Sequence, residues 1–126
     1  MSEFDQQVTF LPVTDLERST VFYRDTLGLP MVLDQGDCRI FRAAATSFVG
    51  VCERHDLPDP GSVIVTLVTD DVDGRHQALA SAGVVCERPP QLNETYNVYH
   101  AFYRDPDGFL IEIQRFLDPQ WPRMGS

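Results

Sequence analysis

The chain has 126 residues, which fits one domain with a substantial hydrophobic core. It is 43% hydrophobic and 23% charged, which is ordinary for a soluble globular protein. Its formal net charge of -9 argues against a nucleic-acid partner and against an anionic membrane surface, because both would repel it.

The first half of the chain predicts one strand, one helix and then three strands. Residues 8–13, VTFLPV, have the apolar character of a short strand. Thr14 and Glu17 have the spacing of a capping box, so a helix is expected to open there, and Gly28 ends its apolar periodicity. Strands are then expected near residues 30–35, 38–43 and 47–53.

The second half predicts the same order of elements. Residues 62–68, SVIVTLV, predict a strand, and either Asp70 or Asp71 starts a helix that Gly83 ends. The turn at 105–108, DPDG, has Pro and Gly where a turn needs them. Further strands are expected near residues 84–88, 97–103 and 109–114.

The two halves are an internal repeat. Adding 55 takes the VTD at 13–15 to the VTD at 68–70, and it takes Gly28 to Gly83. Adding 62 superimposes the last two strands of the first half on the last two of the second, so the second half is longer by about seven residues. The chain therefore predicts two copies of one βαβββ unit.

The predicted architecture is a single α+β domain over residues 1–126. Module one covers about 7–54, module two covers about 62–116, and an irregular tail covers 117–126. A helix covers one face of each mixed sheet, so two uncovered faces remain. We expect these faces to combine into a cup, with the helices on the outer face.

The repeated pattern, the stretch VTDLERSTVFYRDTLGL and the stretch FYRDPDGFLIEI resemble the vicinal oxygen chelate superfamily. This superfamily includes glyoxalase I, bleomycin-resistance proteins and extradiol dioxygenases, and the resemblance covers residues 7–116. It implies a cup between the modules. In the superfamily's enzymes, the first and last strands of each module supply His, Gln or Glu ligands to one divalent metal. Fold alone does not imply any of these activities.

At the superfamily's four metal-ligand positions, this chain has Val8, Gly50, Val63 and Glu112. A one-residue slip in the repeat would replace Val63 by Ile64, which is also apolar. One carboxylate cannot form the usual three-ligand site. We therefore predict no metal site and no cofactor. A divalent metal with atypical ligands, for example Glu112 with a histidine, is the alternative.

The face on which Glu112 lies depends on the register of the last hairpin. If Arg104 pairs with Phe109, then Ala101 pairs with Glu112, and His100 points to the other face. A bulge or a different register would reverse this. On this register and on strand alternation, the expected ligand-binding residues are Phe10, Arg39, Phe41, Tyr99, Tyr103, Glu112 and, from the tail, Trp121. Glu112 is also the single candidate catalytic residue, as a general base.

Three functions remain open. A metal-free protein of the bleomycin-resistance type would bind a planar or cationic small molecule in the cup. A divalent-metal lyase, isomerase or dioxygenase with atypical ligands is the first alternative, and a non-catalytic dimerisation or regulatory module is the second. The sequence does not decide whether a reaction is catalysed. Exposed sheet edges predict a homodimer in each case.

The cysteines and the length of the apolar runs indicate the cellular compartment in which the protein is expected. Cys38, Cys52 and Cys86 are odd in number and show no C-x-x-C pairing, so we expect reduced buried thiols in a cytoplasmic protein. The N-terminus is acidic and no apolar run reaches membrane length, so neither a signal peptide nor a transmembrane helix is expected.

Overall fold

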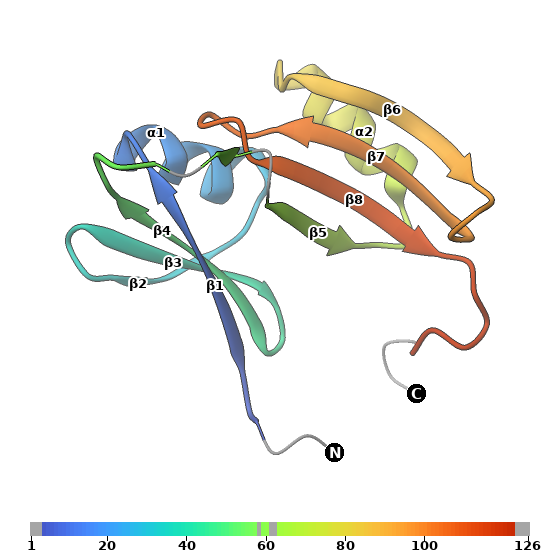
Figure 1. The fold of residues 1–126 in the computed structure, drawn as a ribbon, viewed down its shortest axis with the longest axis horizontal. Helices are drawn as coiled ribbons and strands as arrows, with labels where there is room; N and C mark the ends of the chain where they lie inside the picture. Colours follow the sequence, from blue (N-terminus) through green and yellow to red (C-terminus); the bar gives the residue numbers. More distant parts are fainter. Residues whose placement is uncertain (1–3, 58, 61–62, 123–126) are drawn as a thin grey trace. The chain divides into compact units, whose positions relative to one another are not determined.

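A computed structural model describes residues 4–57, 59–60 and 63–122. It divides into two compact units, the first within residues 1–62 together with 105–108, and the second with the remainder. Each unit contains one four-stranded mixed sheet and one helical segment in the order βαβββ, as predicted (Figure 1). The α+β class and the two-module repeat are therefore confirmed. Ser62 and residues 123–126, which the predicted strand and tail included, lie outside the described residues.

Unit one builds its sheet in the order β1-β4-β3-β2. The β1–β4 pair is parallel, and the other two pairs are antiparallel. Its elements are β1 (Gln7–Val13), α1 (Leu16–Thr20), the π-helical turn η1 (Val21–Thr26), β2 (Met31–Asp34), β3 (Cys38–Ala44) and β4 (Ser47–Glu53).

The helix of unit one packs on one face of this sheet. Its N-cap is Asp15, whose carboxylate accepts from the Arg18 amide, so the predicted capping by Thr14 is wrong. Tyr23 is fully buried and stacks on Phe41 of β3 with ring centroids 6.0 Å apart. Aromatic side chains of this size contribute most of the burial energy of a small core.

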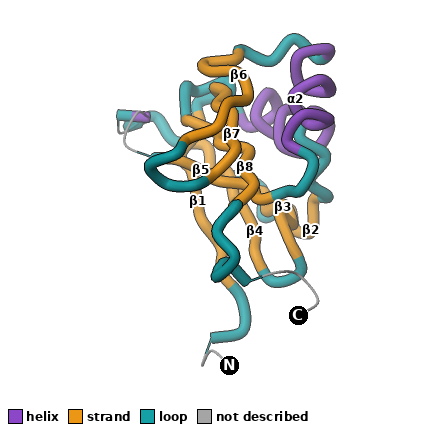
Figure 2. The backbone as a smooth tube through the Cα atoms, turned by 90° about the vertical axis from the view of Figure 1, so that its right-hand side faces the viewer, coloured by secondary structure: helices purple, strands orange, loops and turns teal. Residues whose placement is uncertain are grey.

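Unit two repeats the arrangement with strand order β5-β8-β7-β6. The helix α2 lies against β6, β7 and β8 on one face of the sheet (Figure 2). The Asp71 carboxylate caps α2 by accepting from the Gly74 amide at 3.0 Å. The elements are β5 (Ile64–Val68), α2 (Val72–Ser81), β6 (Cys86–Asn93), β7 (Val98–Arg104) and β8 (Leu110–Phe116).

The two modules differ by one residue in their helical segments. The N-caps Asp15 and Asp71 are 56 positions apart (71 minus 15), whereas Gly28 and Gly83, both at φ +78°, are 55 apart. The extra residue of unit one is accommodated in η1, where the Leu27 amide bonds to the carbonyl five residues earlier. The first strands of the two modules are therefore offset by 56 residues, which makes Ile64 and not Val63 the counterpart of Val8.

The turn at 105–108 belongs to unit one. The Tyr23 hydroxyl donates to Asp105 at 2.7 Å, and the Thr14 hydroxyl donates to Asp107 at 2.6 Å. Burial and the Asp105 carboxylate raise the pKa of Tyr23. The two aspartates of this turn thus anchor it to the helical segment of unit one.

The prediction of three reduced cysteines is wrong in this structure. Cys38 and Cys52 stand directly opposite each other on β3 and β4 and form a disulfide, with Cα atoms 4.1 Å apart. Adjacent strands bring such pairs within bonding reach although they lie far apart in the sequence. Cys86 is a free, exposed thiol. None of the helices in the described part of the chain is long and apolar enough to cross a membrane.

Candidate functional site

The sheet of unit two has a hollow on the face away from α2. Its volume is about 480 Å³, and β5, β6, β7 and β8 all contribute to its walls. Half of the lining residues are apolar or aromatic, and the other half are polar or charged, with His100 and Glu112 among the latter. The lining residues are Ile64, Arg88, Asn93, Tyr96, Val98, His100, Phe102, Glu112, Gln114 and Phe116.

His100 and Glu112 form a buried pair in this hollow. Nδ1 of His100 lies 2.6 Å from Oε2 of Glu112, and their side chains are 7% and 12% exposed. The Thr66 hydroxyl donates to Oε1 of the same carboxylate at 2.7 Å. Both carboxylate oxygens are therefore engaged, and the rotamer of Glu112 is held from two neighbouring strands.

The second ring nitrogen of His100 is the unusual atom of the site. An ionised carboxylate can only accept, so Nδ1 donates to it, and when the ring is neutral Nε2 is then an acceptor. Nε2 is buried and has no hydrogen-bond partner among the residues that the structure describes. Buried polar atoms of this kind are uncommon and costly, and a bound ligand is one of the ways to satisfy them.

Aromatic rings surround the pair. The Phe102 ring meets the His100 ring edge-to-face with centroids 4.8 Å apart, and the Arg88 guanidinium lies over Phe102 at 5.9 Å. The Phe116 ring stacks on Trp121 with centroids 3.6 Å apart. The site can therefore offer a flat apolar surface beside one oriented acceptor.

The predicted register of the last hairpin is wrong by one residue. Arg104 pairs with Leu110, so Phe102 pairs with Glu112, and His100 shares the Glu112 face. The predicted placement of Tyr99 and Tyr103 on that face is wrong for the same reason. Their hydroxyls contact Asp73 and His76 of α2 on the opposite face of the sheet.

The predicted face of Arg39 and Phe41 is wrong as well. Arg39 forms an ion pair with Glu17 of α1 at 2.7 Å, and its guanidinium donates to the Thr20 hydroxyl. Phe41 is fully buried against Tyr23. Both side chains therefore pack toward the helix.

Besides Glu112, two of the predicted ligand-binding residues remain candidates. Phe10 is 52% exposed on the face of its sheet that lies away from α1, where it covers Gly50. A Cβ atom at Gly50 would lie 2.5 Å from Cδ1 of Phe10, so a side chain at residue 50 would displace this ring. Trp121 does not line the hollow of unit two, but it supports Phe116, which does.

The superfamily's metal-ligand positions do not fit a metal. With the corrected offset they are Val8, Gly50, Ile64 and Glu112, of which one has a donor side chain. Within residues 4–57, 59–60 and 63–122, no group of three or more His, Cys, Asp or Glu could hold an ion. His100 and Glu112 supply two donors at most, below the three of a facial triad.

Comparison with known proteins agrees with this fold. A sequence model described as the glyoxalase/bleomycin resistance protein/dioxygenase superfamily matches residues 6–113. The chain is 31% identical over 122 residues to the uncharacterised protein YraH of Bacillus subtilis (strain 168). That match covers 85% of this chain and 94% of YraH.

Solved structures show the same fold at lower identity. A glyoxalase/bleomycin resistance protein/dioxygenase from Nocardioides superimposes with a TM-score of 0.77 at 18% identity, covering 100% of this chain and 91% of that chain. A superfamily member from Sphaerobacter thermophilus gives 0.74 at 24% identity, covering 87% and 95%. By its sequence match and its fold, the chain belongs to the glyoxalase/bleomycin resistance protein/dioxygenase superfamily.

Proposed function

We propose that this protein binds a small molecule in the hollow of unit two, as a binding protein of the bleomycin-resistance type that lacks the usual metal site. The observation that carries the proposal is the buried Nε2 of His100, which has no partner among the described residues. His100 lines a hollow of about 480 Å³, a volume that suits a drug-sized ligand.

The chemistry of the wall defines the class of ligand. A planar ring would pack on Phe102 and Phe116, and one O–H or N–H group of the ligand would donate to Nε2 of His100. Glu112 fixes the tautomer that makes Nε2 an acceptor, so its role is that of a positioning residue. The candidate catalytic role of Glu112 is not needed for this function.

A pair of probe compounds tests the proposal directly. 2-Naphthol carries the donor and 2-methoxynaphthalene lacks it, while their rings are the same. We expect 2-naphthol to raise the unfolding midpoint, and to stabilise the native state by about 2.7 kcal/mol at 100 times its Kd. The ether should bind about three- to tenfold more weakly, because one net hydrogen bond is lost.

Variants locate the binding. The double variant His100→Phe with Glu112→Leu removes both partners and leaves no unpaired buried charge, so it should fold and lose the preference for 2-naphthol. The control is His76→Phe, which changes a histidine on the opposite face of the same sheet. Equal preference for 2-naphthol in the wild type and the double variant would overturn the proposal, as would no binding by the wild type. No binding by the wild type would favour a regulatory or dimerisation module.

A divalent-metal lyase, isomerase or dioxygenase is the alternative function. The observation in its favour is that His100 and Glu112 are in direct contact. Elemental analysis of the untagged protein distinguishes the two functions. We expect no stoichiometric metal. A content close to one metal per chain that disappears in Glu112→Ala would replace the binding proposal by this alternative.

A further inference from the structure

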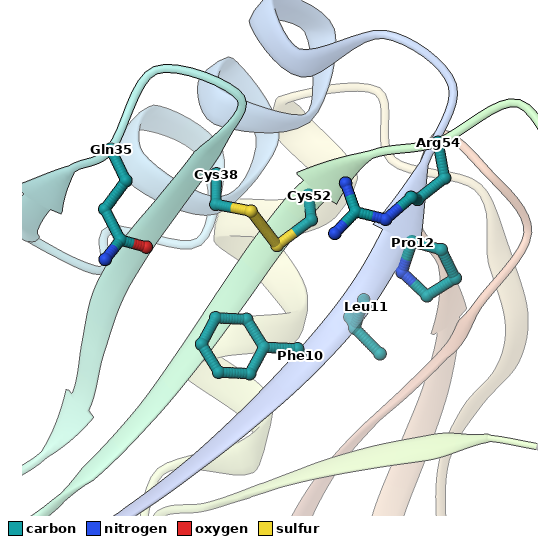
Figure 3. Close-up of a pocket in the computed structure, with 7 residues that line it drawn as sticks. All are labelled: Phe10, Leu11, Pro12, Gln35, Cys38, Cys52 and Arg54. Atoms are coloured by element: carbon teal, nitrogen blue, oxygen red, sulfur yellow. A yellow bond between two sulfur atoms is a disulfide. The ribbon is translucent and has the colours of Figure 1, made fainter.

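We propose that the Cys38–Cys52 disulfide of unit one is a thiol–disulfide exchange site for a small anionic thiol. The disulfide lies on the face of the sheet away from α1, in a pocket of about 390 Å³. The other residues of the pocket wall are Phe10, Leu11, Pro12, Gln35 and Arg54 (Figure 3). Both cysteines belong to this wall, where Cys38 is 9% and Cys52 is 7% exposed, so the pocket is the side from which a small reagent would approach them.

The internal repeat gives this pocket a counterpart in unit two. Adding 62 takes Cys38 to His100 and Cys52 to Gln114, both of which line the hollow of unit two. The pairings agree, because Cys38 pairs with Cys52 as His100 pairs with Gln114. Each module thus has a pocket at the same positions of its sheet, and unit one places a disulfide where unit two places a histidine.

Arg54 supplies the charge that selects an anionic thiol. Figure 3 shows its side chain reaching toward the disulfide from the side of Cys52. One guanidinium nitrogen donates to the Glu53 carbonyl at 2.8 Å and lies 3.9 Å from Asp37, while the side chain is 51% exposed. The nearby Glu53 carboxylate accepts from the Leu16 amide. The remaining guanidinium donors can therefore meet a carboxylate carried by the incoming thiol.

The apolar part of the pocket suits the carbon chain of such a thiol. Phe10 and Pro12 form this wall beside the two sulfurs. Phe10 is half exposed, so part of its ring is available for contact. A short aliphatic thiol with a terminal carboxylate would have its chain on this wall and its charge at Arg54.

The exchange is a two-step reaction. An incoming thiolate attacks Sγ of Cys38 and forms a mixed disulfide, the Cys38–Cys52 bond breaks, and its electron pair leaves as the Cys52 thiolate. Arg54 stabilises this leaving group, which is why Cys38 is the sulfur attacked. A second thiolate then attacks the sulfur of the bound reagent and releases a small disulfide and the Cys38 thiolate. Both protein thiolates take up protons, so two thiols are oxidised and one protein disulfide is reduced.

The test uses two thiols of opposite charge, 3-mercaptopropionate and cysteamine. Cys86→Ser is the background, because the exposed Cys86 would react as well. After a short incubation of the folded protein, free thiols are blocked with N-ethylmaleimide and mapped by peptide mass spectrometry. We expect 3-mercaptopropionate on Cys38 and maleimide on Cys52.

The rate ratio of the two thiols tests the role of Arg54. Replacing Arg54 by Gln should slow the reaction of 3-mercaptopropionate about fivefold, the effect of one charge at about 4 Å in water, and should lower the ratio of 3-mercaptopropionate to cysteamine by at least that factor. Arg24→Gln is the matched control, since Arg24 pairs with Asp25 outside the pocket. Three results would overturn the proposal: free Cys38 and Cys52 in the aerobically purified protein, exchange that occurs only on unfolding, and an unchanged ratio in Arg54→Gln.

Discussion

The contact between His100 and Glu112 determines the role of both residues. Glu112 stands among apolar neighbours of β8, where an isolated carboxylate would be costly. His100 and Thr66 both contact its carboxylate, which removes that cost and orients the histidine at the same time. The carboxylate therefore orients His100, which lines the hollow and whose Nε2 has no partner among the described residues.

Tyr103 supports a prediction on pH. Burial, with a smaller contribution from Cys86, raises the pKa of Tyr103 from 10.0 to about 12. The unfolded tyrosine ionises near pH 10 and the folded one does not. The free energy of unfolding should therefore be unaffected below pH 10 and fall as the pH rises to about 12, by no more than about 2.7 kcal/mol from this residue. Urea unfolding at several pH values measures it.

The control for that prediction is Tyr103→Phe. It should unfold with a shallower pH dependence between pH 10 and 12, while Tyr23, whose pKa is also raised, continues to contribute. Absorbance of tyrosinate near 295 nm gives the ionisation in parallel. The same pH slope in both proteins would show that Tyr103 ionises without a stability cost.

His100 could not be assigned to the site from the sequence. Strand alternation correctly grouped Tyr99 and Tyr103 with each other and apart from His100, because side chains alternate along any strand. Which group faces Glu112 depends on the number of residues in the turn. The turn holds five residues between Arg104 and Leu110, one more than assumed, and one residue inverts every face.

At the scale of elements, η1 accommodates a one-residue insertion without disturbing the strands. This insertion could not be recognised from the sequence, because the VTD motif and the two glycines both match at an offset of 55. The first strands and the N-caps, by contrast, match at 56, as shown by Val8 with Ile64 and by Asp15 with Asp71. A π turn has no composition of its own, so residue types alone do not locate it.

Deleting Asp25 tests this account of η1. Asp25 is an exposed residue of the π turn, paired with its neighbour Arg24. The deletion should convert the turn to α-helix and change the free energy of unfolding by less than about 1 kcal/mol, as is usual for surface changes. Deleting Val49 from β4 is the control, because it reverses the faces of a central strand and should prevent folding. Comparable loss of stability in both deletions would contradict the account.

The disulfide supports a second prediction at this scale. It joins residues 14 apart, and a loop of that length is worth up to about 3 kcal/mol of unfolding free energy. The double variant Cys38→Ala with Cys52→Ala should therefore unfold about 2–3 kcal/mol more easily than the wild type without reductant. With dithiothreitol the two proteins should differ by less than about 1 kcal/mol, because the constraint is then absent from both. A difference that persists in reductant would show that packing, not the cross-link, is responsible.

For the molecule as a whole, the sequence predicted the repeat and the fold class, since periodicity and turn residues are local signals. The counterpart of Val8 in the second module is Ile64 and not Val63, as the strand pairing shows. The sequence could not predict which side chains meet in each pocket. Cys38 meets Cys52, and His100 meets Gln114, only through strand pairing. The two modules therefore share a scaffold and differ in the side chains at these matched positions.

Self-association is the prediction that concerns the whole chain. β2 is an edge strand with Met31, Val32 and Leu33 exposed, and such apolar edges favour pairing with a second copy. We expect a species of twice 14.3 kDa in sedimentation equilibrium. Leu33→Lys should shift it toward the monomer, and Val85→Lys, at an exposed site outside the strands, should not. A monomeric wild type, or equal effects of both changes, would refute an interface at β2.

A nitrogen-15 NMR titration of the histidine side chains with 2-naphthol tests most directly whether His100 binds the ligand. The Nε2 resonance of His100 should move on binding, because a hydrogen bond forms to it, and those of His76 and His55 should stay in place. Saturable binding with no change at His100, or no binding at all, would contradict the claim that this buried pair is the ligand site.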